Sequence, residues 1–128
     1  MKSIAAFSNS DGGTLLIGVN DDGEILGLEN DYSTLHGTRD QFELHLRNLI
    51  NRSFGVGFAV GNLAITFPMS GDREVCQVDI KRALHPQYLE VKDKNTGSKT
   101  QKFYVRSGNS SIELSLSEIS DYIQERFH

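Results

Sequence analysis

The sequence predicts an α+β fold, with two to three helices packed on a mixed and mainly antiparallel sheet. Short apolar segments separated by glycine-rich and polar turns indicate strands, and several of them follow one another without an intervening helix. Two longer segments, 39–52 and 116–127, carry apolar residues at helical spacing, and each is preceded by a capping-box pattern. Helices that alternate with hairpins in this way are typical of a sheet covered by helices.

Length and composition predict one soluble domain over residues 1–128. A chain of 128 residues, 38% hydrophobic and 23% charged, is long enough to bury one core without disulfides. No apolar segment is long enough to span a membrane, and no secretory leader opens the chain. The single cysteine, Cys76, is typical of a reducing compartment. We therefore expect a cytoplasmic protein.

The stretch 4–28 carries the densest local information. Its start, Ile4–Phe7, is typical of the end of a helix, which the glycine loop Asn9–Gly13 must terminate. An apolar run, Thr14–Val19, then predicts a strand covered on both faces, and a tight turn leads into a return strand at Ile25–Leu28. The first helix begins without a cap, so we expect a fragment of a longer protein.

Further strands are predicted at Leu63–Met69 and Glu74–Ile80. In the second of these, Cys76, Val78 and Ile80 alternate with polar residues, which makes Cys76 a core residue and not a nucleophile.

The last third of the chain predicts an edge strand, a polar loop, a strand, a second loop and a closing helix. The corresponding ranges are 87–92, 93–100, 102–106, 107–111 and 116–127.

Basic residues are concentrated in one part of a chain whose net charge is −4. Between Lys81 and Arg106 there are seven basic and two acidic residues, while the remainder has six basic and fifteen acidic residues. One face is therefore predicted to attract a polyanion, and the candidate phosphate contacts are Lys92, Lys94, Lys99, Lys102 and Arg106. The alternative is a solvated hairpin tip, where lysines are common.

Two glycine-containing loops are candidates for anion binding. The first has Asn9, Gly12, Gly13 and Thr14 as candidate phosphate-loop residues, and its alternative is a structural turn, because Asp11 would repel phosphate. The second extends from Arg106 through Gly108 to Ser111, with Asn109 and Ser110 as polar contacts. Its alternative is a capped helix entry in which Arg106 pairs with a surface carboxylate.

Metal-ligating patterns are weak. The four histidines and Cys76 share no zinc spacing, so no cofactor is expected. Asp21 and Asp22 lie in an acidic turn and are candidate Mg²⁺ ligands only if partners come from elsewhere.

Two blocks of residues together resemble the Schlafen/AlbA-like domain family, over nearly the whole chain. The first block has Ala6-Phe7, Asn9, Gly12-Gly13-Thr14-Leu15, Ile17-Gly18-Val19, Asp22-Gly23, Ile25 and Gly27, and the second has Tyr104-Val105-Arg106, Gly108, Ser110 and the segment Leu116–Ile119. The resemblance implies the α+β fold and engagement of nucleic acid, in bacterial and archaeal modules of regulators or defence proteins, some linked to AAA-type proteins.

The resemblance also bears on catalysis. Relatives in animals include ribonucleases that use a metal-dependent trio of acidic residues, two of them on a strand upstream of the Ala-Phe-x-Asn helix. This chain starts inside that helix, and the third position corresponds to Asn20, followed by Asp21 and Asp22. The trio is incomplete, and the missing strand implies an open sheet edge at which a second copy or another chain would pair.

The hypothesis is a non-catalytic module that binds DNA or RNA through phosphates, within a transcriptional regulator or defence-type protein with flanking domains. The alternatives are a truncated endoribonuclease that uses Mg²⁺ or Mn²⁺, and a nucleotide-binding or protein-interaction module that uses the glycine loop.

Overall fold

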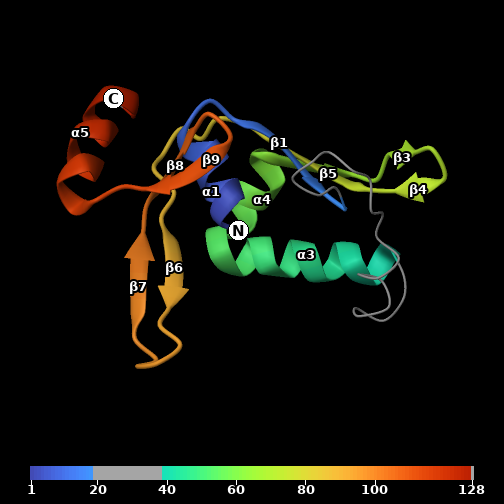
Figure 1. The fold of residues 1–128 in the computed structure, drawn as a ribbon, viewed down its shortest axis with the longest axis horizontal. Coiled ribbons are helices and arrows are strands. Elements are labelled where there is room, and N and C mark those ends of the chain that lie inside the picture. The colour runs from blue at the N-terminus through green and yellow to red at the C-terminus, as the bar shows by residue number, and fades with distance from the viewer. Residues whose placement is uncertain (19–38, 128) are drawn as a thin grey trace. The chain divides into compact units, whose positions relative to one another are not determined.

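The computed structural model describes residues 1–18 and 39–127, which fall into two compact units (Figure 1). The first unit is Met1–Gly13 with Ile80–His128, and the second is Thr14–Asp79. Helices combined with several antiparallel sheets confirm the predicted α+β fold. The predicted turn at 20–23 and the return strand at 25–28 lie outside the described residues. No helix within 1–18 and 39–127 has the length and apolar character needed to cross a bilayer.

The first unit contains two helices and two β-hairpins. Their bounds are α1 Lys2–Asn9, β6 Leu89–Lys92, β7 Lys99–Lys102, β8 Tyr104–Ser107, β9 Ser110–Glu113 and α5 Leu116–Arg126. Strand β6 pairs antiparallel with β7, and β8 pairs antiparallel with β9. Helix α1 buries Ile4, Ala5 and Ala6 completely and packs against β8.

The core of the first unit is centred on Phe103, which is fully buried. Its ring meets the rings of Tyr88 and Tyr122 edge to face, with centroids 5.2 and 5.9 Å away. Because Tyr88 precedes β6 and Tyr122 belongs to α5, this cluster joins the base of the β6–β7 hairpin to the last helix.

Two predictions about this unit were wrong. The predicted strand 102–106 is two strands, since β7 ends at Lys102 and β8 starts at Tyr104, with the buried Phe103 between them. The predicted loop 107–111 before a helix is a β-hairpin turn, with Ser107 opposite Ser110 and a positive φ of 59° at Gly108.

The closing helix confirms its predicted capping box. The backbone N–H of Ser115 donates to Oε1 of Glu118 at 2.9 Å, and this hydrogen bond lowers the pKa of Glu118. The predicted apolar face is only partly confirmed, because Leu116 is 87% exposed.

Within its described residues, 14–18 and 39–79, the second unit contains a three-stranded sheet in the order β1-β5-β2 and a short hairpin. The bounds are β1 Gly13–Ile17, α3 Arg39–Phe54, α4 Val56–Gly61, β2 Leu63–Thr66, β3 Met69–Ser70, β4 Arg73–Glu74 and β5 Cys76–Ile80. Helix α3 buries Phe42, Leu46 and Ile50, which recur every fourth residue as predicted.

Several features of the second unit differ from the prediction. The strand predicted at 63–69 is two strands, since β2 ends at Thr66 and β3 starts at Met69, and the strand predicted to be covered on both faces, β1, has Leu16 45% exposed. The strand predicted at 74–80 is interrupted at Val75, which is buried and donates its backbone N–H to the Pro68 carbonyl at 3.1 Å. Helix α4 was not predicted, because its sequence, VGFAVG, is short and has glycine at two of six positions.

Cys76 lies in the core of the second unit, as the alternation in β5 predicted. The side chain is fully buried. Burial, with a smaller contribution from the carboxylate of Glu43, raises the pKa of the thiol to about 11. The thiol is therefore protonated and unreactive at neutral pH.

This pKa predicts a loss of stability at alkaline pH. The folded state holds the Cys76 proton more tightly than the unfolded chain, so the contribution of Cys76 is complete below about pH 8.5 and is lost as the pH rises toward 11. Urea unfolding between pH 8 and 11 should show a steeper fall in the free energy of unfolding for the wild type than for Cys76→Ala. Equal slopes in the two proteins would show that the thiol is not the cause.

Candidate nucleic-acid interface

The β6–β7 hairpin, Leu89–Lys102, projects from the first unit and is named the finger here (Figure 1). Its register places Leu89 opposite Lys102 and Lys92 opposite Lys99. Leu89, at the base, is buried, whereas every residue from 92 to 101 is exposed. The finger is therefore held by the core at its base, and its outer part is open to a ligand.

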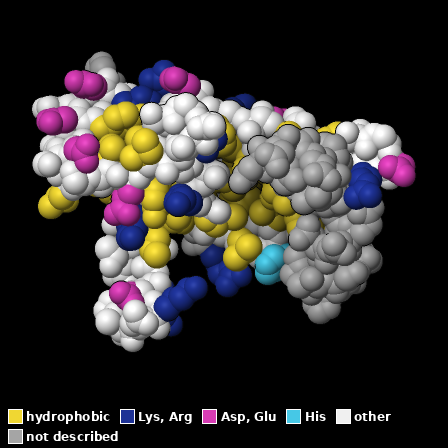
Figure 2. All heavy atoms as spheres, viewed as in Figure 1, with side chains coloured by type: hydrophobic (Ala, Val, Ile, Leu, Met, Phe, Trp, Pro, Cys, Tyr) yellow, Lys and Arg dark blue, Asp and Glu magenta, His cyan; other side chains and the backbone are white. Residues whose placement is uncertain are grey.

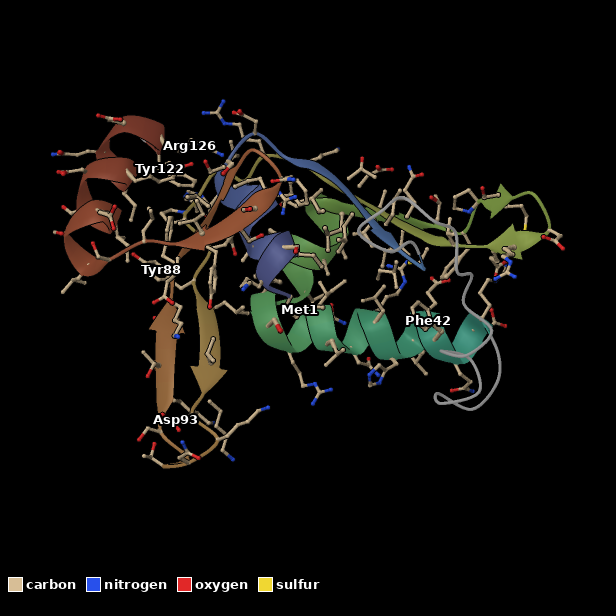
Figure 3. All side chains as sticks on the ribbon, viewed as in Figure 1. Met1, Phe42, Tyr88, Asp93, Tyr122 and Arg126 are labelled. Carbon is tan, nitrogen blue, oxygen red and sulfur yellow. The ribbon has the colours of Figure 1, made fainter. Side chains whose placement is uncertain are left out.

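The tip of the finger is an ordered turn organised by Asp93 (Figure 3). Its Oδ1 accepts hydrogen bonds from the backbone N–H groups of Asn95 at 2.7 Å and Thr96 at 3.2 Å. The backbone of Asp93 bonds to Ser98 and Gly97 at 2.7 and 2.9 Å, and Gly97 has a φ of +75°. The carboxylate of Asp93 thus stabilises the turn, a role that its position in the predicted polar loop did not reveal.

Two lysines face one another on the exposed side of the finger. Residues opposite one another in an antiparallel pair share a face, so Lys92 and Lys99 lie together. Glu90, two residues from Lys92, is on the same face and lies 3.5 Å from Lys99, Oε1 to Nζ. Within the described residues, Lys92 and Lys94 have no carboxylate at ion-pair distance. The outer finger therefore carries an uncompensated positive charge.

Lys102 does not join this group. Opposite Leu89, it lies on the other face of the finger, and its Nζ is 3.4 Å from Oε1 of Glu113 on β9. The basic surface predicted from the sequence is therefore divided, with Lys92 and Lys99 on one face and Lys102 on the other. Figure 2 shows basic side chains (dark blue) beside the tip of the finger, next to an acidic side chain (magenta).

Arg106 lies on β8 and is used within the fold. Its guanidinium carbon is 4.6 Å from the centroid of the Phe7 ring, and its Nη1 is 3.1 Å from Oγ of Ser111. Its Nε is buried and has no hydrogen-bond partner among the residues described. The sequence suggested either a phosphate contact or an ion pair with a carboxylate for Arg106. The observed stacking on Phe7 is neither of these. Asn109 and Ser110 are exposed in the β8–β9 turn, separate from the finger.

The glycines of the first candidate phosphate loop allow close packing. A Cβ on Gly12, whose φ is +80°, would lie 2.6 Å from the Ile80 carbonyl, and a Cβ on Gly13 would lie 2.4 Å from the Phe7 ring. The N–H of Gly12 donates to the Phe7 carbonyl at 2.8 Å, so this group is not free to bind an anion. Thr14 donates its hydroxyl to Asp79 at 2.8 Å. These contacts correspond to the structural-turn alternative.

Asn9 is fully buried and connects three segments of the first unit. Its Nδ2 donates to the carbonyls of Gln87 and Tyr104, both at 2.9 Å, and its Oδ1 accepts from the backbone N–H of Gln87 at 2.8 Å. A phosphate would have to displace these bonds. The asparagine of the Ala-Phe-x-Asn pattern is therefore structural.

Two residues of α5 complete this arrangement and were not singled out from the sequence. Arg126 donates to the carbonyls of Ser8, Ser10 and Ala83 at 2.9 to 3.3 Å, and Tyr122 donates its hydroxyl to the Asn9 carbonyl (Figure 3). Positive charge at the C-terminal end of α1 is favourable. The sequence held one signal for this contact. In the last turn of the closing helix, the apolar residues give way to a polar one, Arg126, which indicates that the end of this helix faces polar groups.

Charge is distributed unequally between the two units. Counted over the whole sequence, the first unit has nine basic and seven acidic residues, a net charge of +2, whereas the second has four basic and ten acidic residues, a net charge of −6. A polyanion is therefore attracted to the first unit.

The candidate metal ligands Asp21 and Asp22 lie outside the described residues. Within residues 1–18 and 39–127, no group of three or more His, Cys, Asp or Glu side chains is arranged to hold a metal ion.

Comparisons with known proteins agree with the fold. The sequence model of the family described as Schlafen, AlbA_2 matches residues 1–115. The crystal structure of the DIP2311 protein from Corynebacterium diphtheriae is similar, with a TM-score of 0.61 and 19% sequence identity. The match covers 99% of this chain but 21% of that chain, so this chain spans about a fifth of the length of that protein. No curated protein matches.

Proposed function

The chain belongs to the Schlafen, AlbA_2 family, and we propose that it is a nucleic-acid-binding module that contacts phosphates through the outer part of the finger. The observation that carries this proposal is the facing pair of Lys92 and Lys99, with Lys94 close by in the tip. Like charges directly opposite in a sheet destabilise it. A ligand with closely spaced negative charges offsets that repulsion, and the phosphates of a nucleic acid have this property.

The surroundings of the finger support the proposal. Glu90 compensates Lys99 only, and the carboxylate of Asp93 is occupied by backbone N–H groups of the turn. Because the backbone of the tip is already ordered, little backbone conformational entropy is lost when the lysines bind. The net charge of the first unit, +2, favours approach from this side, although the whole chain is acidic.

The module is proposed to act without catalysis, as the part of a larger regulator or defence-type protein that senses or tethers nucleic acid. The proposal includes flanking domains, pairing of copies through a sheet edge and a cytoplasmic location. The short span of this chain relative to the DIP2311 protein is consistent with a place in a longer architecture.

Salt dependence tests the proposal. If Lys92, Lys94 and Lys99 each neutralise one phosphate, log Kd for duplex DNA should change with log salt with a slope of about 2.7, or roughly 40-fold between 50 and 200 mM salt. The Lys92→Gln/Lys94→Gln variant should bind more weakly, with a slope of about 0.9. Fluorescence anisotropy with labelled DNA and RNA, single-stranded and duplex, measures both quantities.

The matched control is Lys81→Gln/Arg52→Gln, which removes the same charge from exposed positions outside the finger. It should keep the wild-type slope. An absence of salt-sensitive binding to every nucleic acid would refute the proposed function, and an unchanged slope in the finger variant would refute the assignment to the finger.

A further inference from the structure

The dimensions of the finger match one groove of a nucleic acid. Two paired strands lie about 4.8 Å apart, and the four steps from Leu89 to Asp93 extend roughly 13 Å at about 3.3 Å per residue. The major groove of B-DNA is about 12 Å wide and about 8.5 Å deep and admits a two-stranded ribbon. Measured from its buried base at Leu89, the finger is therefore long enough for its tip to approach the floor of that groove.

The composition of the finger disfavours single strands. Proteins that bind single-stranded nucleic acid combine basic grooves with aromatic side chains on which bases stack. Residues 89–102, LEVKDKNTGSKTQK, contain no aromatic residue, and Tyr88, which precedes them at the base and is 40% exposed, meets Phe103 edge to face. The finger can therefore contact phosphates and base edges but offers no platform for unstacked bases.

The tip carries polar groups suited to base edges. The side-chain carboxamide of Asn95 makes no hydrogen bond within the described residues, because only its backbone N–H is used in the turn. Carboxamides pair with adenine in the major groove, where each base pair presents a distinct pattern of donors and acceptors. Lys92 and Lys99, set back from the tip, are placed for phosphates at the groove edge.

We infer that the ligand of this module is duplex DNA, entered by the tip of the finger through the major groove. This inference rests on the proposed function. A-form RNA disfavours the same arrangement because its major groove is deep and too narrow for side chains to read.

Anisotropy titrations at fixed salt test the inference, using a labelled 20-base-pair DNA duplex, each of its single strands and an RNA duplex of the same sequence. We expect the DNA duplex to bind at least about tenfold more tightly than the other three. A DNA duplex with bulky substituents at the pyrimidine 5-positions, which project into the major groove, should bind about tenfold more weakly than the unmodified duplex.

A variant with a shortened finger tests whether the tip is responsible for the preference for duplex DNA. Replacing residues 93–98 with Asn-Gly keeps Lys92 opposite Lys99 across a two-residue turn and removes one positive and one negative charge, so the net charge is unchanged. This variant should lose the preference for duplex DNA and keep salt-sensitive binding.

The outcomes separate the two proposals. Equal or tighter binding to single strands or to the RNA duplex, or full affinity for the substituted duplex, would overturn the major-groove inference while leaving the proposed function intact. If the variant with the shortened finger keeps the preference for duplex DNA, the major-groove inference is likewise overturned and the proposed function stands. No salt-sensitive binding to any of these ligands would overturn both.

Discussion

Lys92→Glu is expected to weaken nucleic-acid binding by about tenfold or more at low salt while slowing hydrogen exchange in the finger. The substitution places a carboxylate directly opposite Lys99, so a repulsive cross-strand pair becomes an attractive one. Opposite charges at such positions stabilise a hairpin by about 0.2–1 kcal/mol. The same change removes one phosphate contact and neutralises a second, which leaves Lys94 as the remaining cation of the outer finger.

Lys92→Glu should weaken nucleic-acid binding but stabilise the finger, and these opposite effects distinguish a binding residue from a structural one. Affinity is measured by anisotropy, and hydrogen–deuterium exchange of the finger amides reports its local stability. Arg52→Glu makes the same change in net charge on the exposed side of α3 and should alter neither quantity. Faster exchange in Lys92→Glu, or affinity equal to that of Arg52→Glu, would contradict the role assigned to the facing lysines.

Asn9→Ala is expected to lower the free energy of unfolding by about 3–5 kcal/mol, a large part of the stability of a domain of this size. The substitution removes three hydrogen bonds and leaves the N–H and carbonyl of Gln87 and the carbonyl of Tyr104 without their partner. Because Asn9 is fully buried beside β8, its loss leaves polar groups without partners in the packing between α1 and β8, which is costly.

Urea unfolding followed by circular dichroism gives the free energy of unfolding for the wild type and Asn9→Ala. Asn95→Ala is the matched control, since it removes the same carboxamide from the exposed tip and should change the stability by less than about 0.5 kcal/mol. A loss below about 1 kcal/mol in Asn9→Ala would show that the buried network is dispensable. Folded Asn9→Ala protein should retain the affinity of the wild type, because Asn9 is buried and lies outside the finger.

The pattern that identifies the family and the surface proposed to bind nucleic acid are different parts of the chain. The Ala-Phe-x-Asn and Gly-Gly residues join α1 to the segments that contain Ile80, Gln87 and Tyr104. Lys92, Lys94 and Lys99 lie beyond the buried base of the finger. We therefore expect the global stability to respond mainly to Asn9→Ala and the affinity mainly to Lys92→Glu.

The sequence by itself determined the elements whose signals are local. Apolar residues every fourth position predicted α3, alternation predicted the buried face of β5, and Ser115 with Glu118 predicted the start of α5. The family and the α+β class followed from such local patterns and their order. Short elements were missed, α4 among them, because two glycines in six residues outweigh its apolar content.

Only the tertiary structure decided which polar residues are free. In the sequence, Asn9 and Arg106 are both candidate ligand contacts. In the structure, Asn9 donates a hydrogen bond to the Tyr104 carbonyl and Arg106 stacks on the Phe7 ring. Lys99 and Lys102 are three residues apart, and the register places them on opposite faces of the finger. Partners distant in sequence and the side to which a strand residue points depend on how segments pair, and composition and spacing along the chain do not specify that pairing.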